Sequence, residues 1–175
     1  MIIDLNKILP EGQEIKKNFK PAAIGLDIKE AIIKQDISLE LQISKINRGF
    51  RFLGSLRGLI NIQCARCLEF YPYPISTPFE LVYLPLAEAK EGEIELKDRD
   101  MNVSFLPEEK VDLRELVREQ ILLLLPMKPL CSEDCRGLCP RCGVNLNLKQ
   151  CKCNSKRIDP RLEPLKKIKG LFKMR

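Results

Sequence analysis

Apolar and polar residues begin to alternate along the chain in the segment 37–43. This two-residue period is typical of a strand with one buried face. A small polar and glycine turn follows at 47–49, and two further strand-like stretches cover 50–62 and 68–84. The pattern predicts an antiparallel meander, built as a curved or barrel-like sheet.

Glycines and prolines qualify this prediction. Gly54 and Gly58 interrupt the second stretch and indicate bulges or bends. Pro72, Pro74 and Pro78 lie in the third stretch and limit it to edge or broken strands, because proline cannot donate to a ladder. The first 35 residues show only weak periodicity, so no element is predicted there.

The clearest helix lies near 112–125. Asp112 and Glu115 have the spacing of a capping box, and Pro126 ends the pattern. One face repeats at helical spacing and consists of Leu113, Leu116, Val117, Gln120, Ile121 and Leu124. We expect this face to cover one side of the sheet.

Two other segments give weaker signals. The acidic stretch 88–109 reads as a long connection, in which only Ile94, Leu96, Val103 and Phe105 could form short strands. Asp159 and Pro160 indicate a turn or helix start before a short basic segment at 162–172.

Taken together, the patterns predict an α+β fold with a mainly β domain over 1–130 and a cysteine-rich segment over 131–175 that packs on it. No apolar run approaches the roughly 20 residues of a membrane-spanning helix, and the start lacks a secretory signal. We therefore expect a cytoplasmic protein without a membrane partner. In that reducing compartment, cysteines indicate metal or redox chemistry rather than disulfides.

Eight cysteines fall in close pairs along the chain. The pairs are Cys64 with Cys67, Cys131 with Cys135, Cys139 with Cys142, and Cys151 with Cys153. Structural zinc takes four thiolates in a tetrahedron, and a short loop with two cysteines supplies half of such a site. The pairs therefore predict two zinc ions, held for structural purposes.

The loops can be combined into sites in more than one way. We favour one site from the pairs at 139–142 and 151–153, because a single short loop links them. The pairs at 64–67 and 131–135 would then form the other site and tie the sheet to the segment that leaves the helix. The alternative joins the pairs at 131–135 and 139–142 locally, and it stays open at this point.

Other cysteine chemistry fits the pattern less well. A thioredoxin-like CxxC opens a helix in a βαβ unit, whereas the residues around Cys64 and Cys67 resemble strands. An iron–sulfur cluster also takes four cysteines, and the spacing alone leaves that choice open. A catalytic zinc would need an open coordination position and usually His or carboxylate ligands.

The sequence lacks histidine and the common phosphate-binding loops. The chain has no histidine, which removes Ser–His–Asp and Cys–His arrangements and HExxH metallopeptidases. It also lacks the GxxxxGK[ST] and GxGxxG phosphate-binding loops. We expect a protein that is not an enzyme and takes no small-molecule substrate.

The motifs, taken in chain order, resemble the YceD family, bacterial and plastid proteins named for accumulation of large-subunit ribosomal RNA. The resemblance is carried by CARCL at 64–68, DLxEL at 112–116, ILLLLP at 121–126, PLC at 129–131, GLCPxCGxNLN at 137–147 and DPR at 159–161. It implies a non-enzymatic role in the synthesis, processing or stability of that RNA. It further implies that the protein binds the RNA or pre-ribosomal particles.

The charge distribution is consistent with such a partner. Residues 1–130 carry 18 Lys and Arg against 20 Asp and Glu, whereas residues 131–175 carry 12 against 4, a net charge of +8. A segment this basic is a candidate for binding an anionic partner. The candidate RNA contacts are Arg136, Arg141, Lys149, Lys152, Lys156, Arg157 and Arg161.

A protein-interaction module is the alternative function. In that case the zinc sites shape a surface for a protein partner, and the chain does not bind RNA directly. The acidic region 88–119 motivates this alternative, because it would repel RNA and attract basic proteins.

Overall fold

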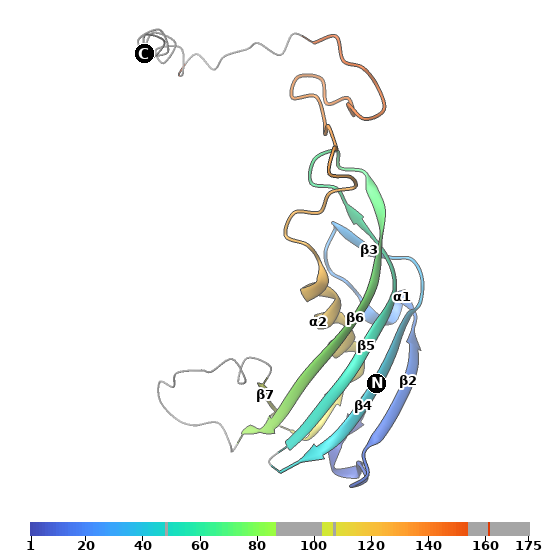
Figure 1. Ribbon diagram of the computed structural model, residues 1–175, viewed down its shortest axis with the longest axis vertical. Helices are drawn as coiled ribbons and strands as arrows, with labels where there is room; N and C mark the ends of the chain where they lie inside the picture. The colour runs from blue at the N-terminus through green and yellow to red at the C-terminus, as the bar shows by residue number, and fades with distance from the viewer. Residues whose placement is uncertain (48, 87–102, 107, 154–160, 162–175) are drawn as a thin grey trace. The chain divides into compact units, whose positions relative to one another are not determined.

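The computed structural model describes residues 1–47, 49–86, 103–106, 108–153 and 161 (Figure 1). The chain divides into two compact units. The first comprises Met1–Cys64 and Glu69–Cys131, and the second comprises Ala65–Leu68 and Ser132–Arg175. The regular strands and helices all lie in the first unit among the described residues, and loops and turns form the second.

Three long antiparallel strands form the centre of the first unit. They are β4 (Ile37–Ile46), β5 (Gly49–Gln63) and β6 (Phe70–Pro85), and each pairs with the next along the chain. Figure 1 shows all three as long, curved ribbons side by side. The predicted antiparallel meander is confirmed, since its three stretches become these strands.

Three shorter strands extend the sheet, in the order β2-β4-β5-β6-β7 with β3 beside β5. Strand β2 (Gln13–Phe19) is antiparallel to β4, and β3 (Ala31–Ile33) is antiparallel to β5. Strand β7 (Val103–Leu106) runs parallel to the end of β6, so the sheet is mixed. The path is open, because no described strand joins β2 to β7. The barrel-like alternative is therefore wrong.

The remaining short elements frame this sheet. Strands β1 (Ile2–Asp4) and β8 (Lys110–Asp112) pair antiparallel as a separate two-stranded sheet. A 3-10 turn, η1 (Leu5–Lys7), follows β1. A one-turn helix, α1 (Pro21–Ile24), follows β2 and ends at Gly25, whose φ of 57° is in the left-handed region.

Two of the three glycines of β5, Gly54 and Gly58, make room for neighbouring side chains. A Cβ on Gly54 would overlap the ring of Phe79, and a Cβ on Gly58 would overlap the Ile37 side chain. Pairing with β6 continues through both positions without a bulge, and pairing with β4 continues through Gly54. The expectation of bulges is therefore wrong, because these glycines serve side-chain packing.

The prolines of β6 lie along an open edge of the strand. Pro72, Pro74 and Pro78 are separated by even numbers of residues, so all three backbone nitrogens point to the same side of the strand. Strand β7 pairs only with Val82–Pro85 of β6. Among the described residues, no strand lies on that side of β6 between residues 70 and 81. The strand is unbroken, and the prediction of an edge holds for this part of it.

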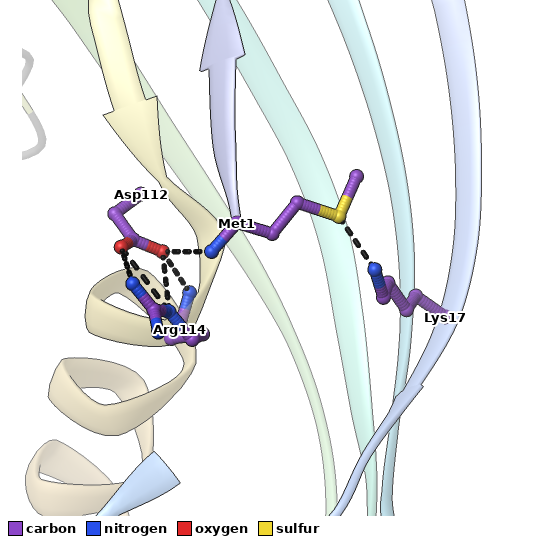
Figure 2. Close-up of polar contacts among 4 residues, drawn as sticks. All are labelled: Met1, Lys17, Asp112 and Arg114. Carbon is purple, nitrogen blue, oxygen red and sulfur yellow. Dashed lines mark hydrogen bonds and ion pairs between the residues drawn. The ribbon is translucent and has the colours of Figure 1, made fainter. Parts of the chain in front are cut away.

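Helix α2 (Leu113–Leu124) begins and ends where its sequence predicts. The Asp112 carboxylate accepts the Arg114 N–H at 2.9 Å, and Leu125 closes the last turn before Pro126. Figure 2 shows the same carboxylate bound by the Arg114 guanidinium and by the Met1 amino group. The Arg114 hydrogen bonds, joined by the Met1 amine, hold the pKa of Asp112 well below its usual range. Met1 also receives a hydrogen bond on its sulfur from Lys17.

The core lies between α2 and one face of the sheet. Leu113, Leu116, Val117 and Ile121 of the helix are at most 2% exposed and belong to one cluster with the inward rows of β4 and β5. Leu124 packs against its border. The helix thus covers the sheet as its apolar face predicts, visible beside β5 and β6 in Figure 1.

Some sequence predictions fall outside the described residues. These are the strand candidates Ile94 and Leu96, the turn at Asp159 and Pro160, and the basic segment 162–172. Among the described residues, no helix has the length and apolar character needed to cross a membrane.

Candidate metal centres

The first cysteine loop is the turn between β5 and β6. The N–H of Cys64 donates to the carbonyl of Glu69 at 2.9 Å, which closes the turn directly after the last strand pair. Leu68, the residue after Cys67, has a φ of 61°. This left-handed backbone is unfavourable for a branched side chain and costs on the order of 1 kcal/mol. The turn therefore holds the two cysteines at the expense of local strain.

The loop at Cys139 and Cys142 repeats this conformation with a glycine. Gly143 has a φ of 70°, and its N–H donates to the carbonyl of Cys139 at 2.9 Å. The N–H of Cys139 donates in turn to the carbonyl of Val144 at 2.9 Å. Both CxxC loops thus place a left-handed residue after their second cysteine, and only the second loop uses the residue type that fits it without strain.

The structure gathers the eight cysteines into two groups. The first tetrad is Cys64, Cys67, Cys131 and Cys135, and the second tetrad is Cys139, Cys142, Cys151 and Cys153. Within each tetrad the four sulfur atoms lie within 4.8 Å of one another. This grouping is the one favoured from the spacing, and it replaces the local alternative that joined 131–135 with 139–142.

The two tetrads differ in burial. In the first, Cys64, Cys67 and Cys135 are buried and Cys131 is exposed. In the second, only Cys139 is buried, Cys151 is half-buried, and Cys142 and Cys153 are exposed. Solvent therefore reaches the second tetrad far more readily than the first.

The sulfur separations fit a tetrahedral metal site. A metal–sulfur bond of about 2.3 Å gives a tetrahedron whose edges are about 3.8 Å. The Cys151 Sγ lies 3.3 Å from the Cys139 Sγ and 3.5 Å from the Cys142 Sγ, distances well beyond the roughly 2.05 Å of a disulfide. Each tetrad could therefore hold one metal ion through four thiolates. Binding itself, and zinc as the ion, stay predictions.

Hydrogen bonds shift the pKa values of two thiols of the second tetrad in opposite directions. The backbone N–H groups of Cys142 and Arg141 donate to the Cys139 sulfur and lower its pKa to about 6. At Cys151 the Cys153 N–H acts in the same sense, but hydrogen bonds with the surrounding thiols outweigh it and raise the pKa to about 12.

Arg66 fixes the loop that carries Cys135, a role not foreseen from the sequence. Its guanidinium Nη1 donates to the carbonyls of Glu133 at 3.1 Å and Cys135 at 2.9 Å. Its own carbonyl accepts the N–H of Leu138 at 3.1 Å, and a Cβ on Gly137 would crowd that same carbonyl. Gly137 also has a φ of 71°, so both its conformation and its surroundings favour glycine.

Asn147 links the loop that carries Cys135 to the segment that follows Cys142. Its Nδ2 donates to the Cys135 Sγ at 3.3 Å, and its Oδ1 accepts the Arg136 N–H at 2.8 Å. Next to these contacts, Leu138 and Asn145 form an isolated antiparallel bridge, directly before Cys139. Arg66 and Asn147 both lie inside the cysteine motifs, and that position is the one sequence signal that could have drawn attention to them.

The candidate RNA contacts fall on these loops as far as they are described. Arg136, Arg141, Lys149, Lys152 and Arg161 are all exposed, whereas Lys156 and Arg157 lie outside the described residues. Arg141 lies between Cys139 and Cys142, and Lys152 lies between Cys151 and Cys153. Contacts between these cysteines therefore bring the two cations onto adjacent loops.

Comparison with known proteins gives several matches. An uncharacterized protein of Mycobacterium tuberculosis is 27% identical over 150 residues, which cover 86% of this chain and 70% of its own length. The protein named large ribosomal RNA subunit accumulation protein YCED homolog 1, chloroplastic, of Arabidopsis thaliana is 25% identical and covers 83% of this chain and 54% of its own. A Bacillus subtilis protein is 28% identical over 117 residues, which cover 65% of this chain and 63% of its own. No solved structure matches the chain.

The family comparison covers most of the residues discussed above. The model of the family described as large ribosomal RNA subunit accumulation protein YceD matches residues 52–169, which is more than half of the chain and includes all eight cysteines. The chain therefore belongs to the YceD family of large ribosomal RNA subunit accumulation proteins.

Proposed function

We propose that this protein supports the accumulation of large-subunit ribosomal RNA without catalysing a reaction. It binds that RNA, or pre-ribosomal particles that contain it, through the exposed basic residues of its cysteine loops. The observation that carries the proposal is the placement of Arg136, Arg141, Lys149 and Lys152. All four are exposed, and all four lie on loops whose backbone is held by the cysteines and by Asn145 and Asn147.

A fixed set of cations suits a phosphate backbone. Arg and Lys contacts to phosphates release condensed counterions, and this release supplies much of the affinity of proteins for nucleic acids. Loops held at several points lose less conformational entropy when they bind than a flexible tail of the same charge. The described loops meet this condition, because Arg136 and Lys149 are each anchored through a backbone N–H.

In this proposal the two tetrads each bind one zinc ion, and the ions are structural. Zinc supplies four bonds that fix the loops, and the residues of the chain make the RNA contacts. The proposal places the protein in the cytoplasm, where a reducing environment keeps thiolates available as ligands. It includes no small-molecule substrate and no membrane partner.

The test is a salt titration of binding to large-subunit ribosomal RNA. We expect the variant R136E/R141E/K149E/K152E to bind at least a hundredfold more weakly at moderate salt. The slope of log K against log salt is negative, and each lost phosphate contact reduces its magnitude by about 0.7 for single-stranded RNA, so four lost contacts reduce it by about 3.

The matched control reverses four exposed lysines of the first unit, K20E/K29E/K34E/K45E. It changes net charge by the same amount and should retain most of the affinity. Equal losses in the two variants would mean that only net charge matters. Unchanged affinity in the first variant, with its metal content and fold intact, would contradict the proposed RNA surface.

The protein-interaction module is the second candidate, and exposed apolar residues favour it. Leu123 is 78% exposed at the end of α2, and Met127 just beyond it is fully exposed. A pull-down from nuclease-treated lysate distinguishes the two functions. A single stoichiometric protein recovered after nuclease treatment supports this candidate, whereas recovery that disappears with the RNA supports direct RNA binding.

A further inference from the structure

The second tetrad combines ligand geometry with access to solvent. Cys142 is exposed and its Sγ lies 3.5 Å from the Sγ of half-buried Cys151. In the first tetrad three of the four cysteines are buried, and Cys131 is the one exposed sulfur-bearing residue. A small polar oxidant can therefore reach a close pair of sulfurs in the second tetrad, whereas in the first it reaches one residue with buried neighbours.

We propose that the second tetrad is an oxidant-sensitive modification site, in which a peroxide joins Cys142 to Cys151 and releases the bound ion while the first tetrad keeps its own. Reactivity of cysteines toward oxidants follows thiolate character and exposure. Both tetrads supply thiolates when they hold a metal, so exposure is the property that separates them. This site is independent of whether the partner of the protein is RNA or another protein.

The reaction balances without a further co-reactant. The Cys142 thiolate attacks one peroxide oxygen, the O–O bond breaks, and the hydroxide that leaves takes up a proton to become water. The sulfenic sulfur so formed is attacked by the Cys151 thiolate, the S–S bond forms, and the S–O bond breaks to release a second hydroxide, which also becomes water. Two electrons pass from the two sulfurs to the peroxide, and two protons are consumed.

Loss of the ion follows from the ligand count. A disulfide removes two of the four thiolates, and two remaining thiolates do not complete a tetrahedral site. The first tetrad shares no cysteine with the second and is not depleted. A thiol reductant should restore both thiolates, and added zinc should then bind again.

Tryptic peptides make the reaction readable in the full-length protein. Cleavage after Lys and Arg places each cysteine of the second tetrad on its own peptide, namely 137–141, 142–149, 150–152 and 153–156. The experiment treats the chain loaded with two equivalents of zinc with hydrogen peroxide. It follows released zinc with a chromogenic chelator and identifies linked peptides by mass spectrometry after alkylation.

We expect one equivalent of zinc to be released at least tenfold faster than the second. The peptides 142–149 and 150–152 should become linked in the fast phase, and dithiothreitol should reverse both changes. Simultaneous release of both ions, earlier oxidation of first-tetrad cysteines, or release without this linked pair would overturn the proposal.

Two single variants provide matched controls, since each replaces an exposed cysteine of one tetrad. C142S should abolish the linked pair, whereas C131S removes a ligand of the first tetrad, so it should lose the slowly released ion and keep the linked pair. The peptide map of the unaltered chain decides the question even where C142S fails to retain its ion. If the unaltered chain shows a fast phase in which other peptides become linked, the assignment of the pair to Cys142 and Cys151 is wrong.

Discussion

The two cysteine tetrads use the same type of loop but lie in different surroundings. The first contains Cys64 at the end of a long strand and has three buried cysteines, whereas the second is carried by turns and has one. The same ligand set can therefore have two effects. We expect an ion in the buried tetrad to stabilise the structure around it, and an ion in the exposed tetrad to shape a surface that stays open to reagents from solvent.

The largest expected effect comes from removing one ligand from each tetrad in turn. Cys64 and Cys139 are matched, because each is the buried first cysteine of a CxxC loop. An ion present at about a thousand times its Kd stabilises a fold by about 4 kcal/mol. C64S should lose one ion and about that much free energy of unfolding, whereas C139S should lose one ion and leave the unfolding of the sheet unchanged.

The comparison needs metal analysis together with thermal unfolding followed by circular dichroism of the sheet. Two ions retained in C139S would contradict the assignment of the second tetrad. Equal destabilisation by the two variants would remove the distinction between a stabilising tetrad and a surface tetrad.

A smaller effect is expected at Asn147, whose side chain donates a hydrogen bond to the sulfur of Cys135 in the first tetrad. N147A removes the hydrogen bond to the Cys135 Sγ and the acceptor for the Arg136 N–H. Loss of such outer contacts typically lowers metal affinity by 10- to 100-fold, so we expect about tenfold weaker retention of the first-tetrad ion in a chelator competition. N147D keeps the acceptor but puts a negative charge near the sulfur, and it should weaken retention further. Unchanged retention in both variants would show that this hydrogen bond plays no part in holding the ion.

The smallest effect concerns the residue that follows each CxxC loop. Leu68 and Gly143 share a left-handed conformation, with φ values of 61° and 70°. L68G should relieve strain and raise the free energy of unfolding by at most about 1 kcal/mol, while G143A should introduce strain of about 1 kcal/mol. Urea unfolding and chelator competition would measure the two. Changes of the same sign would mean that the two loops are not equivalent.

The sequence predicted the parts of the fold that local pattern determines. The alternation in 37–43 and the capping residue Asp112 led directly to β4 and α2. Strand β2 was missed because the row that pairs with the buried residues of β4 includes Gln13 and Lys17, two polar residues that stay exposed at the edge of the sheet. The parallel pairing of β7 with β6 depends on where the chain returns after 87–102, which local pattern does not contain.

In the candidate metal centres, too, some features follow from local sequence and others depend on the folded chain. The cysteines were predictable because the spacing of ligand loops is set by the size of a metal tetrahedron. Arg66 was not, because its hydrogen bonds reach residues 67 and 69 positions further along the chain. The role of Asn147 likewise depends on a hairpin that brings it to Cys135. Candidate ligands can be read from spacing, but the groups that hydrogen-bond to their loops become visible only in the folded chain.

Cadmium-113 NMR of the chain loaded with cadmium in place of zinc tests most directly whether each tetrad binds one ion. Correlations between each cadmium and the β-protons of its cysteines identify the ligands of each ion. We expect two cadmium signals, one coupled to Cys64, Cys67, Cys131 and Cys135 and the other to Cys139, Cys142, Cys151 and Cys153. A cadmium coupled to Cys131, Cys135, Cys139 and Cys142, or a single bound ion, would contradict it.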